Sequence, residues 1–325
     1  MSPIIFEPFL RTMVWGGEKI AAYKNIETDI PRIGESWEIS AFPEHLTAVA
    51  EGPYAGKTIT DLVKEFKGEL VGEHVYARFG NLFPLLIKFI DAGADLSIQV
   101  HPTDEMAARV HGPGSLGKTE MWYVIDAAPG AKLYSGLSKE ITPEEYEAMV
   151  GAGTITDALA CHEVHPGDVF FLPAGRIHAI CSGCFVAEIQ ETSDLTYRIW
   201  DYGRLGIDGK PRQLHTELAK QAVDFKLYDS YRTDYEPVPN DEVELVSCQY
   251  FTTSLFDLTL PYAKDLSEID SFMVVMCVSG SGSLEVDGES LDIRQGQTVL
   301  IPASADDICF IPDEAMKLIT SYIRV

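Results

Sequence analysis

The sequence predicts a mainly β protein made of two related β-barrels with a few short helices. Three observations support this fold class. Short apolar segments with the period of β-strands recur along the chain, and Gly, Pro and Asp separate most of them. One pattern, a strand between a glycine and a proline, occurs twice. The chain has 325 residues, more than a typical single domain, so two cores are expected.

Predicted strands dominate the recognisable elements. In residues 96–101, apolar and polar side chains alternate without interruption, which is the pattern of a half-buried strand. The turn residues between the strands indicate a sandwich or a barrel. Further strands are expected at 83–90, 120–126, 168–172, 185–192, 272–278, 283–286 and 298–302.

The repeated pattern indicates that the barrel is duplicated. Residues 167–173 (GDVFFLP) place a glycine and a proline around a strand, and residues 296–302 (GQTVLIP) do the same. A strand with this punctuation is typical of a barrel edge, so two copies predict two barrels. Only the first copy leads to a histidine, His178, because the second has Asp307 at the matching position. We therefore expect a metal site in the first barrel and a degenerate second barrel.

Three short helices are predicted. Residues 142–145 (TPEE) form a capping box with proline at the first helical position, and Gly151 is expected to end that helix. Residues 60–70 place their apolar side chains on one face, and residues 216–223 have the pattern of a short helix.

A polar linker is expected between the two halves. Residues 229–244 contain two prolines and few apolar side chains. They separate a catalytic domain, residues 1–228, from a C-terminal domain, residues 245–325.

Composition restricts the possible partners. The chain has 50 acidic and 25 basic residues, a net charge of -25, and a pI near 4.6. Such a surface repels nucleic acid and anionic membranes, so an anionic substrate would need local cations in its site. We find no segment typical of a signal peptide or a membrane span, and expect a cytoplasmic protein, a monomer or a small homo-oligomer. Cys181 and Cys184 form a lone CxxC, a weak indication of zinc or redox chemistry.

Four polar side chains could hold a metal ion. Gln99 and His101 lie two residues apart on a predicted strand, so both side chains leave the same face. Glu120 begins another strand, and His178 follows a turn that can direct its imidazole into a barrel mouth. Two imidazoles, a carboxylate and an amide oxygen can bind a divalent ion and leave a position for substrate. Zinc, iron(II), manganese and cobalt all fit these donors.

Two cations near these residues are open to two interpretations each. Lys88 interrupts an apolar strand, where a desolvated lysine can act as a base, but it could also extend to the surface from a strand end. Arg198 could bind a phosphate or an oxyanion, or could form a surface ion pair with Asp194 or Asp201. The remaining histidines, including His215, are interpreted as structural or solvated.

The sequence resembles the type I mannose-6-phosphate isomerases of the cupin superfamily, in their short bacterial form. Gly167-x5-Pro173-x-Gly175-x2-His178 matches the second cupin metal motif. Other matching segments span most of residues 14–204 in the family's order. They are 14–17 (VWGG), 34–40 (GESWEIS), 87–91 (IKFID), 97–102 (SIQVHP), 117–122 (GKTEMW), 173–179 (PAGRIHA) and 188–198.

The resemblance implies jelly-roll barrels of the cupin type and one zinc ion per chain, held by Gln99, His101, Glu120 and His178. It also implies a sugar-phosphate pocket lined by Trp15, Lys88, Lys118, Glu188, Asp194 and Arg198. One departure is Gly117, which stands where longer members of the family have a histidine. A proton role for that histidine is therefore excluded here.

The implied reaction converts mannose 6-phosphate to fructose 6-phosphate through a cis-enediol. Lys88, or less favourably Glu188, would move the proton, while Arg198 and Lys118 would supply positive charge. Two alternatives come from other classes. The donors also suit an iron(II) oxygenase, although Gln99 as a fourth ligand fits a redox-inert metal better. A non-catalytic sugar-binding cupin is the other alternative, which the intact set of polar residues disfavours.

Overall fold

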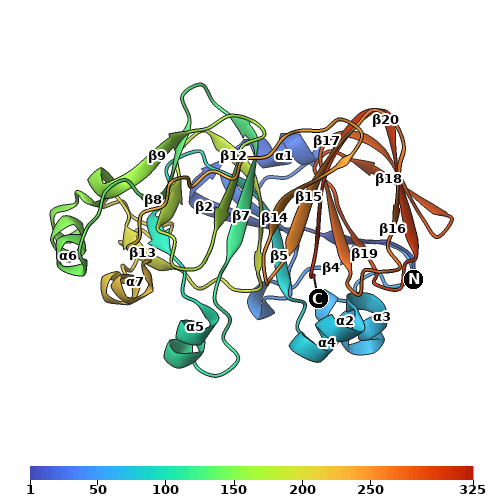
Figure 1. Cartoon of the computed structure of the whole chain (residues 1–325), viewed down its shortest axis with the longest axis horizontal. Helices are drawn as coiled ribbons and strands as arrows, with labels where there is room; N and C mark the ends of the chain where they lie inside the picture. Colours follow the sequence, from blue (N-terminus) through green and yellow to red (C-terminus); the bar gives the residue numbers. More distant parts are fainter. Residues whose placement is uncertain (325) are drawn as a thin grey trace.

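The chain folds into three antiparallel β-sheets with short helices around them, and the computed structural model describes residues 1–324. Two sheets make up one half of the molecule, at the left of Figure 1, and a nine-stranded sheet makes up most of the other half. The prediction of a mainly β protein with few helices is confirmed.

The first half contains a six-stranded and a five-stranded sheet. The strand orders are β10-β7-β12-β5-β3-β2 and β13-β6-β11-β8-β9. The bounds are β2 Phe9–Gly17, β3 Ile33–Ile39, β5 Leu85–Asp91, β6 Ile98–Val100, β7 Glu120–Ala127, β8 Lys132–Leu137, β9 Leu159–Glu163, β10 Val169–Leu172, β11 His178–Ile180, β12 Cys184–Glu191 and β13 Tyr197–Trp200.

The nine-stranded sheet combines the C-terminal strands with two from the beginning of the chain. β1 (Ile4–Glu7) pairs with β19 (Thr298–Ile301), and β4 (Ala48–Val49) pairs with β1. Residues predicted to lie in the first domain therefore complete the C-terminal sheet, and the domain division at 229–244 stays a prediction. The other strands are β14 Glu242–Ser247, β15 Thr252–Leu258, β16 Tyr262–Asp265, β17 Met273–Val286, β18 Glu289–Arg294 and β20 Asp307–Tyr322.

Apolar side chains from facing sheets form the cores. Trp122, Phe170 and Val186 of the six-stranded sheet pack with Leu133 and Ile180 of the five-stranded sheet in one buried cluster. The opposite face of the six-stranded sheet packs against the nine-stranded sheet. Strands β5 and β12 are consequently buried on both faces, which explains why their sequences are nearly continuous apolar runs.

Most predicted strands are confirmed, with two differences. The segment 96–101 forms only a three-residue strand, β6. The segments 272–278 and 283–286 belong to one strand, β17, and not to two. Register shifts between Cys277 and Ser279 and between Gly280 and Gly282 let β17 bend without ending, as β-bulges do. The two repeated segments form β10 and β19, each entered through a glycine with positive φ.

The helices follow the predicted pattern with shifted ends. The segment 60–70 is not one helix, because Lys67 has a φ of 50° and separates α2 (Ile59–Phe66) from α3 (Gly68–Val71). The capping box at Thr142 is confirmed, but the helix ends at Gly153, which is left-handed, and not at Gly151. This helix is α6 (Pro143–Ala152), and the predicted helix at 216–223 is α7 (Thr216–Ala222). The remaining helices are α1 Lys19–Lys24, α4 Glu73–Phe79 and α5 Asp104–His111, with 3-10 turns at Pro43–His45 and Ile155–Ala158.

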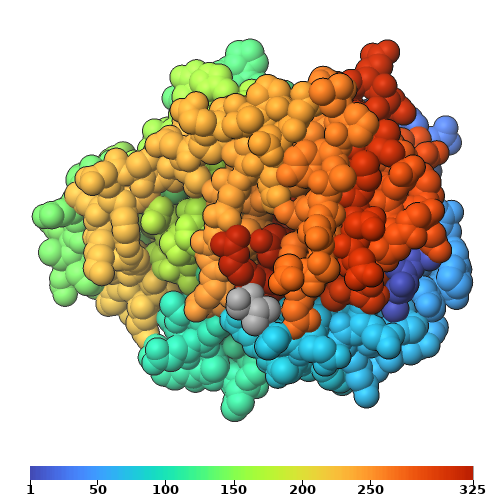
Figure 2. Space-filling model, turned by 45° about the vertical axis from the view of Figure 1, so that its right-hand side comes forward, coloured from blue at the N-terminus to red at the C-terminus, as the bar shows by residue number. Residues whose placement is uncertain are grey.

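The predicted linker runs over the surface. Figure 2 shows the chain around residues 229–244, in light orange, crossing between the first half and the C-terminal strands. Its last residues enter β14. None of the helices in residues 1–324 combines the length and apolar character needed to cross a membrane.

A buried ion pair joins the two halves. The Nζ atom of Lys24, at the end of α1, donates to both carboxylate oxygens of Glu38 at 2.8 and 2.7 Å. It also donates to the carbonyl oxygen of Gly296, at 2.5 Å, just before β19. Lys24 is 7% exposed and Glu38 is 4% exposed. Three hydrogen bonds therefore satisfy a desolvated ammonium group between the sheets.

Replacing Lys24 with methionine is expected to lower the free energy of unfolding by about 3 kcal/mol or more, because Glu38 would stay buried as an unpaired charge. The double variant Lys24→Met, Glu38→Leu should recover part of this loss. Urea unfolding followed by circular dichroism measures both effects. Lys57→Met, which breaks an exposed pair with Glu65, is the control and should change stability by less than about 0.5 kcal/mol. Equal losses in the two lysine variants would contradict the role given to the buried pair.

Candidate metal centre and pocket

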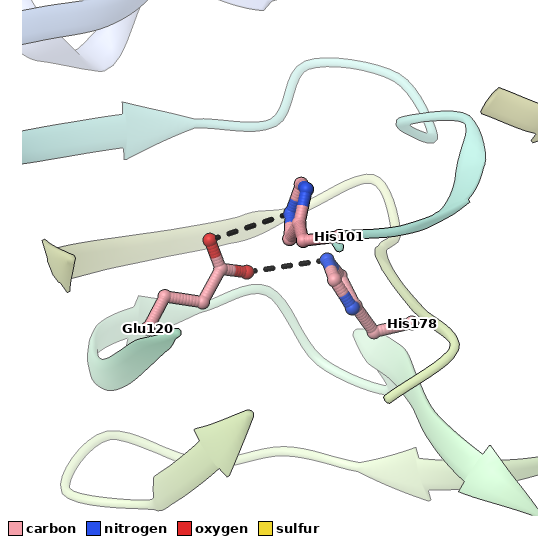
Figure 3. Close-up of side chains that lie close together, drawn as sticks. All are labelled: His101, Glu120 and His178. Atoms are coloured by element: carbon pink, nitrogen blue, oxygen red, sulfur yellow. Dashed lines mark ion pairs between the residues drawn. The ribbon is translucent and has the colours of Figure 1, made fainter. Parts of the chain in front are cut away.

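Three titratable side chains meet where strands of both smaller sheets begin or end. His101 follows the last residue of β6, His178 is the first residue of β11, and Glu120 is the first residue of β7. β6 and β11 are neighbours, and His178 pairs with Gln99 in the register. Figure 3 shows both imidazoles facing the carboxylate of Glu120. The structure thus brings together residues that lie up to 79 positions apart in the sequence.

The atoms of this cluster are close and buried. The Nε2 atom of His101 lies 3.5 Å from one carboxylate oxygen of Glu120, and the Nε2 atom of His178 lies 3.2 Å from the other. The Nε2 atom of Gln99 is 3.3 Å from Nε2 of His178. The two histidines and Glu120 are at most 2% exposed. Their potential ligand atoms all lie within 4.8 Å of one another.

Hydrogen bonds fix which imidazole nitrogen carries the proton. The Nδ1 atom of His101 is 2.8 Å from the carbonyl oxygen of Leu195, and that of His178 is 2.7 Å from the carbonyl oxygen of Arg176. A carbonyl only accepts, so each Nδ1 is a donor and each neutral Nε2 presents a lone pair. Burial, followed by the positive charge of Lys118, lowers the pKa of His101 to about 3. The close approach of His101 to Glu120 therefore lacks a proton at neutral pH.

This arrangement fits a metal ion. Nε2 of His101 and Oε1 of Glu120 have no hydrogen-bond partner among the described residues, while Oε2 of Glu120 lies 2.8 Å from the ammonium group of Lys118. Buried lone pairs that face a carboxylate are unfavourable unless a cation lies between them. The amide of Gln99 can turn its oxygen inward by a half rotation, since amide nitrogen and oxygen occupy equivalent positions. Nitrogen and oxygen donors of this kind suit a divalent ion of intermediate softness.

A pocket with a volume of about 210 Å³ lies beside the cluster. Gln99 and Lys118 connect the pocket to the cluster, because they line the pocket and contact His178 and Glu120. All six residues predicted for the sugar-phosphate pocket line it, together with Gln99, which was predicted as a metal ligand. The six are Trp15, Lys88, Lys118, Glu188, Asp194 and Arg198.

Two lysines and two glutamates form a chain of charges at the base of the pocket. Nζ of Lys118 is 2.8 Å from Glu120 and 3.9 Å from Oε1 of Glu188, and Nζ of Lys88 is 3.2 Å from the same Oε1. Burial alone would lower the pKa of Lys118, but the attraction of Glu120 and Glu188 outweighs it and raises the pKa. Lys88 is only 2% exposed, so the alternative in which it extends to the surface is wrong.

Arg198 faces the pocket without a carboxylate partner in residues 1–324. Its guanidinium donates to the hydroxyl of Ser97 at 3.3 Å and to the carbonyl of Gln213 at 2.9 Å. Asp201 is instead paired with other arginines. Burial and the charge of Arg212 lower the pKa of Arg198. The surface ion pair considered from the sequence is therefore wrong.

Comparisons with known proteins cover nearly the whole chain. The model of the phosphomannose isomerase type I catalytic domain matches residues 5–117, and that of the mannose-6-phosphate isomerase cupin domain matches residues 241–323. A putative mannose-6-phosphate isomerase of Bacillus subtilis is 33% identical over 325 residues, with 99% of both chains covered. The mannose-6-phosphate isomerase of Streptococcus mutans is 32% identical, with 98% of both covered.

Solved structures agree. The crystal structure of the mannose 6-phosphate isomerase from Bacillus subtilis has a TM-score of 0.89 and 32% identity, over 99% of this chain and 100% of that one. The chain belongs to the type I phosphomannose isomerase family. It is therefore an enzyme, an isomerase, with a cupin domain. This family is metal-dependent, and the cluster of His101, Glu120 and His178 is a possible site for the metal ion.

Four titratable residues of the isomerase's pocket were not predicted from the sequence: Arg11, Glu35, Arg212 and His215. Glu35 accepts from Arg11 at 3.0 Å and from the indole of Trp37 at 2.6 Å. Burial raises its pKa, but Lys88 and Arg11 outweigh burial and lower it. The backbone nitrogen of Arg198 donates a hydrogen bond to Nδ1 of His215 at 3.2 Å. The alternation in residues 34–40 could have indicated Glu35, whereas Arg212 and His215 lie in a loop without a periodic signal.

The absence of a side chain at position 117 has a steric reason in this enzyme. A Cβ atom at Gly117 would lie 2.6 Å from the carbonyl oxygen of Pro102. The backbone nitrogen of Gly117 donates to Asp104 at 2.8 Å, and that of Thr119 donates to Glu191 at 2.7 Å. Two carboxyl groups thus hold the segment that carries Lys118.

Glu191 is expected to make stability depend on pH. Burial, followed by repulsion from Asp104, raises its pKa from 4.5 to about 8. The folded state therefore retains a proton that the unfolded chain loses, so stability from this group is present at pH 4 and is lost as pH rises to 8. Glu191→Gln, which mimics the protonated group, should be about as stable as the wild type near pH 5 and more stable near pH 9. Urea unfolding at both pH values tests this, and a constant difference between the two proteins would refute it.

Proposed function

We propose that the enzyme interconverts mannose 6-phosphate and fructose 6-phosphate. The observation that carries this proposal is the buried cluster of His101, Glu120 and His178, in which Nε2 of His101 and Oε1 of Glu120 have no hydrogen-bond partner among the described residues, beside a pocket lined by cations. Family membership supports the reaction, and the names of the relatives supply the substrate. The family also favours an isomerase over an iron(II) oxygenase and over a non-catalytic cupin.

One zinc ion per chain is the proposed cofactor. Gln99, His101, Glu120 and His178 would hold it through two imidazole nitrogens, a carboxylate and an amide oxygen. The bound ion would supply a Lewis acid that stabilises negative charge on the substrate's O1 and O2 atoms. Hydrogen bonds from Nδ1 of both histidines to carbonyl oxygens orient the ligands, as is common around protein metal sites.

Two arginines of the pocket lining, Arg198 and Arg212, would bind the phosphate. Arg198 has no carboxylate partner in residues 1–324, and Arg212 lies beside it in the pocket lining. Arginine is well suited to phosphate because its guanidinium offers parallel donors. These local charges would attract an anionic substrate to a protein whose net charge is -25.

Lys88 and Glu188 would move the proton between C2 and C1 of the open-chain sugar through a cis-enediol. A lysine must be neutral to accept a proton, and Glu188, 3.2 Å away, can hold the proton that Lys88 gives up. The oxygen at this distance is Oε1 of Glu188, which is therefore placed to take the proton directly from Lys88. Trp15 would form an apolar wall, Asp194 would accept from sugar hydroxyls, and Lys118 would stabilise the charge of the enediol.

We further propose two barrels of the cupin type, one of which carries the metal. β10 and β19 support the duplication, because each follows a left-handed glycine and precedes a proline. The cluster at His101 is the one group of His, Cys, Asp or Glu with metal-like spacing in residues 1–324. The C-terminal core is instead filled by apolar side chains such as Phe256 and Phe310, which supports a degenerate second barrel.

Removal of the metal is expected to abolish turnover, and zinc should restore it. A coupled assay with mannose 6-phosphate, before and after chelation, measures both. His178→Ala should lose tight zinc binding and activity together, as judged by metal analysis of the purified protein. The control is His162→Ala, which removes a partly buried histidine outside the cluster and should keep both. Full activity of zinc-free His178→Ala would disprove the metal's role, and no turnover with any divalent metal would disprove the substrate.

Lys88→Met is expected to lower kcat by a factor on the order of 100 to 10,000 while zinc content stays at one per chain, because the proton carrier is lost but the ligands are intact. Steady-state kinetics and metal analysis provide the two measurements. Lys132→Met, at an exposed position on β8, is the matched control. A kcat within a few-fold of the wild type would remove Lys88 from the proton transfer.

A further inference from the structure

Asp201 is a buried carboxylate just behind the pocket lining. It follows β13 directly and is 4% exposed. One oxygen accepts from Nε of Arg204 at 2.8 Å. Arg212 donates to both oxygens, from Nε at 2.7 Å and from a terminal nitrogen at 2.6 Å. Arg212 thus makes the two-point contact that fixes a guanidinium in position and in plane.

The backbone around Asp201 leads to this contact through a hairpin. Tyr202 and Gly203 have φ values of 57° and 69°, and the backbone nitrogen of Arg204 donates to the carbonyl of Asp201 at 3.1 Å. This tight turn brings the side chain of Arg204 back to Asp201. The chain then reaches an exposed tip, where Leu205 is 53% and Ile207 is 62% exposed, and returns to Arg212.

The tip of this hairpin, residues 202–211, makes little contact with the rest of the molecule, so its base determines where Arg212 lies. Nearly all of the tip from Tyr202 to Pro211 is exposed or only half-buried. The hydrogen bonds inside it, such as Gly206 to Lys210 at 2.7 Å, shape the hairpin but do not attach it to the sheet. On the side of Asp201, attachment comes from this carboxylate and from a hydrogen bond of Arg204 to the carbonyl of Asp95. After Arg212, the backbone is held by the hydrogen bond from Arg198 to the carbonyl of Gln213, so Asp201 fixes the side chain of Arg212 in particular.

The carboxylate of Asp201 is needed to keep several positively charged arginines close together. Arg204 and Arg212 share the buried carboxylate of Asp201, and Arg198 lies close enough for the positive charges of both to add to burial in lowering its pKa. Without that carboxylate, like charges would repel Arg212 away from Arg198 and into solvent. With it, positive charge remains in excess and faces the pocket from two fixed arginines.

We propose that Asp201 is a positioning residue that holds Arg212 beside Arg198 and thereby sets the affinity for the phosphate group of the substrate. Asp201 touches no substrate itself and acts through Arg212. The inference rests on the proposed sugar-phosphate isomerase function. It assigns the arginine hairpin to phosphate recognition, and leaves the proton transfer to Lys88 and Glu188.

Asp201→Asn in the zinc-loaded enzyme tests this role, since it keeps the shape of the side chain and removes its charge. The KM for mannose 6-phosphate and the inhibition constant of inorganic phosphate should both rise, on the order of tenfold to a hundredfold, while kcat changes by less than about threefold. Zinc content should stay unchanged. A lower kcat with unchanged KM and phosphate inhibition would overturn the proposal.

Two further measurements separate positioning from a general structural effect. In the background of Arg212→Gln, Asp201→Asn should have little additional effect on phosphate inhibition, because Asp201 acts through that arginine. Additive effects would contradict the proposal. Asp168→Asn is the matched control: its aspartate pairs with Arg232 at 2.6 Å outside the pocket, so KM should be unaffected.

The failure of the proposed reaction would be distinguishable from the failure of this inference. If the wild type does not convert mannose 6-phosphate, titration calorimetry with inorganic phosphate still compares the wild type with Asp201→Asn, and equal affinities would refute the role of Asp201. If Asp201→Asn does not fold, Asp201→Glu replaces it. That variant keeps the charge but displaces the carboxylate, and should raise KM by a smaller factor.

Discussion

The structure depends on keeping Glu120 buried between the Nε2 atoms of His101 and His178. This arrangement is unfavourable for the protein alone, because the lone pair on Nε2 of His101 faces a carboxylate in a desolvated place. The carbonyls of Leu195 and Arg176 hold both rings in this orientation by accepting from Nδ1. The backbone of the first half therefore maintains a group of ligands that a divalent cation can satisfy.

Charge balance extends from this cluster into the pocket. Lys118 offsets the charge of Glu120, and Glu188 lies between Lys118 and Lys88. Alternating charges reduce the cost of burying each group, since every ion has an oppositely charged neighbour. Among the arginines of the pocket, Arg212 is paired with Asp201, whereas Arg198 has no carboxylate partner in residues 1–324. The pocket therefore keeps a positive charge that no carboxylate of the protein offsets, as an anionic substrate requires.

Some parts of the fold and of the candidate site follow from local rules. The two-residue period of a strand places Gln99 and His101 on one face, whatever packs around them. A capping box begins a helix at Thr142 because it satisfies the first backbone donors locally. Helix ends and strand breaks were less predictable. Lys67 takes a left-handed conformation, and β17 bends through its glycines without ending, because packing against other elements decides these points.

The sequence by itself determined the mainly β class, the repeated strand, and the types and spacing of the metal-site residues, because these depend on side-chain period and turn chemistry. Only the tertiary structure decided which cations face the pocket. Arg212 and His215 lie in a loop with no periodic signal, and their positions depend on Asp201 and on the backbone of Arg198. The exclusion of a side chain at Gly117 likewise arises from the close approach of Pro102. Such contacts join residues distant in sequence, and no local pattern encodes them.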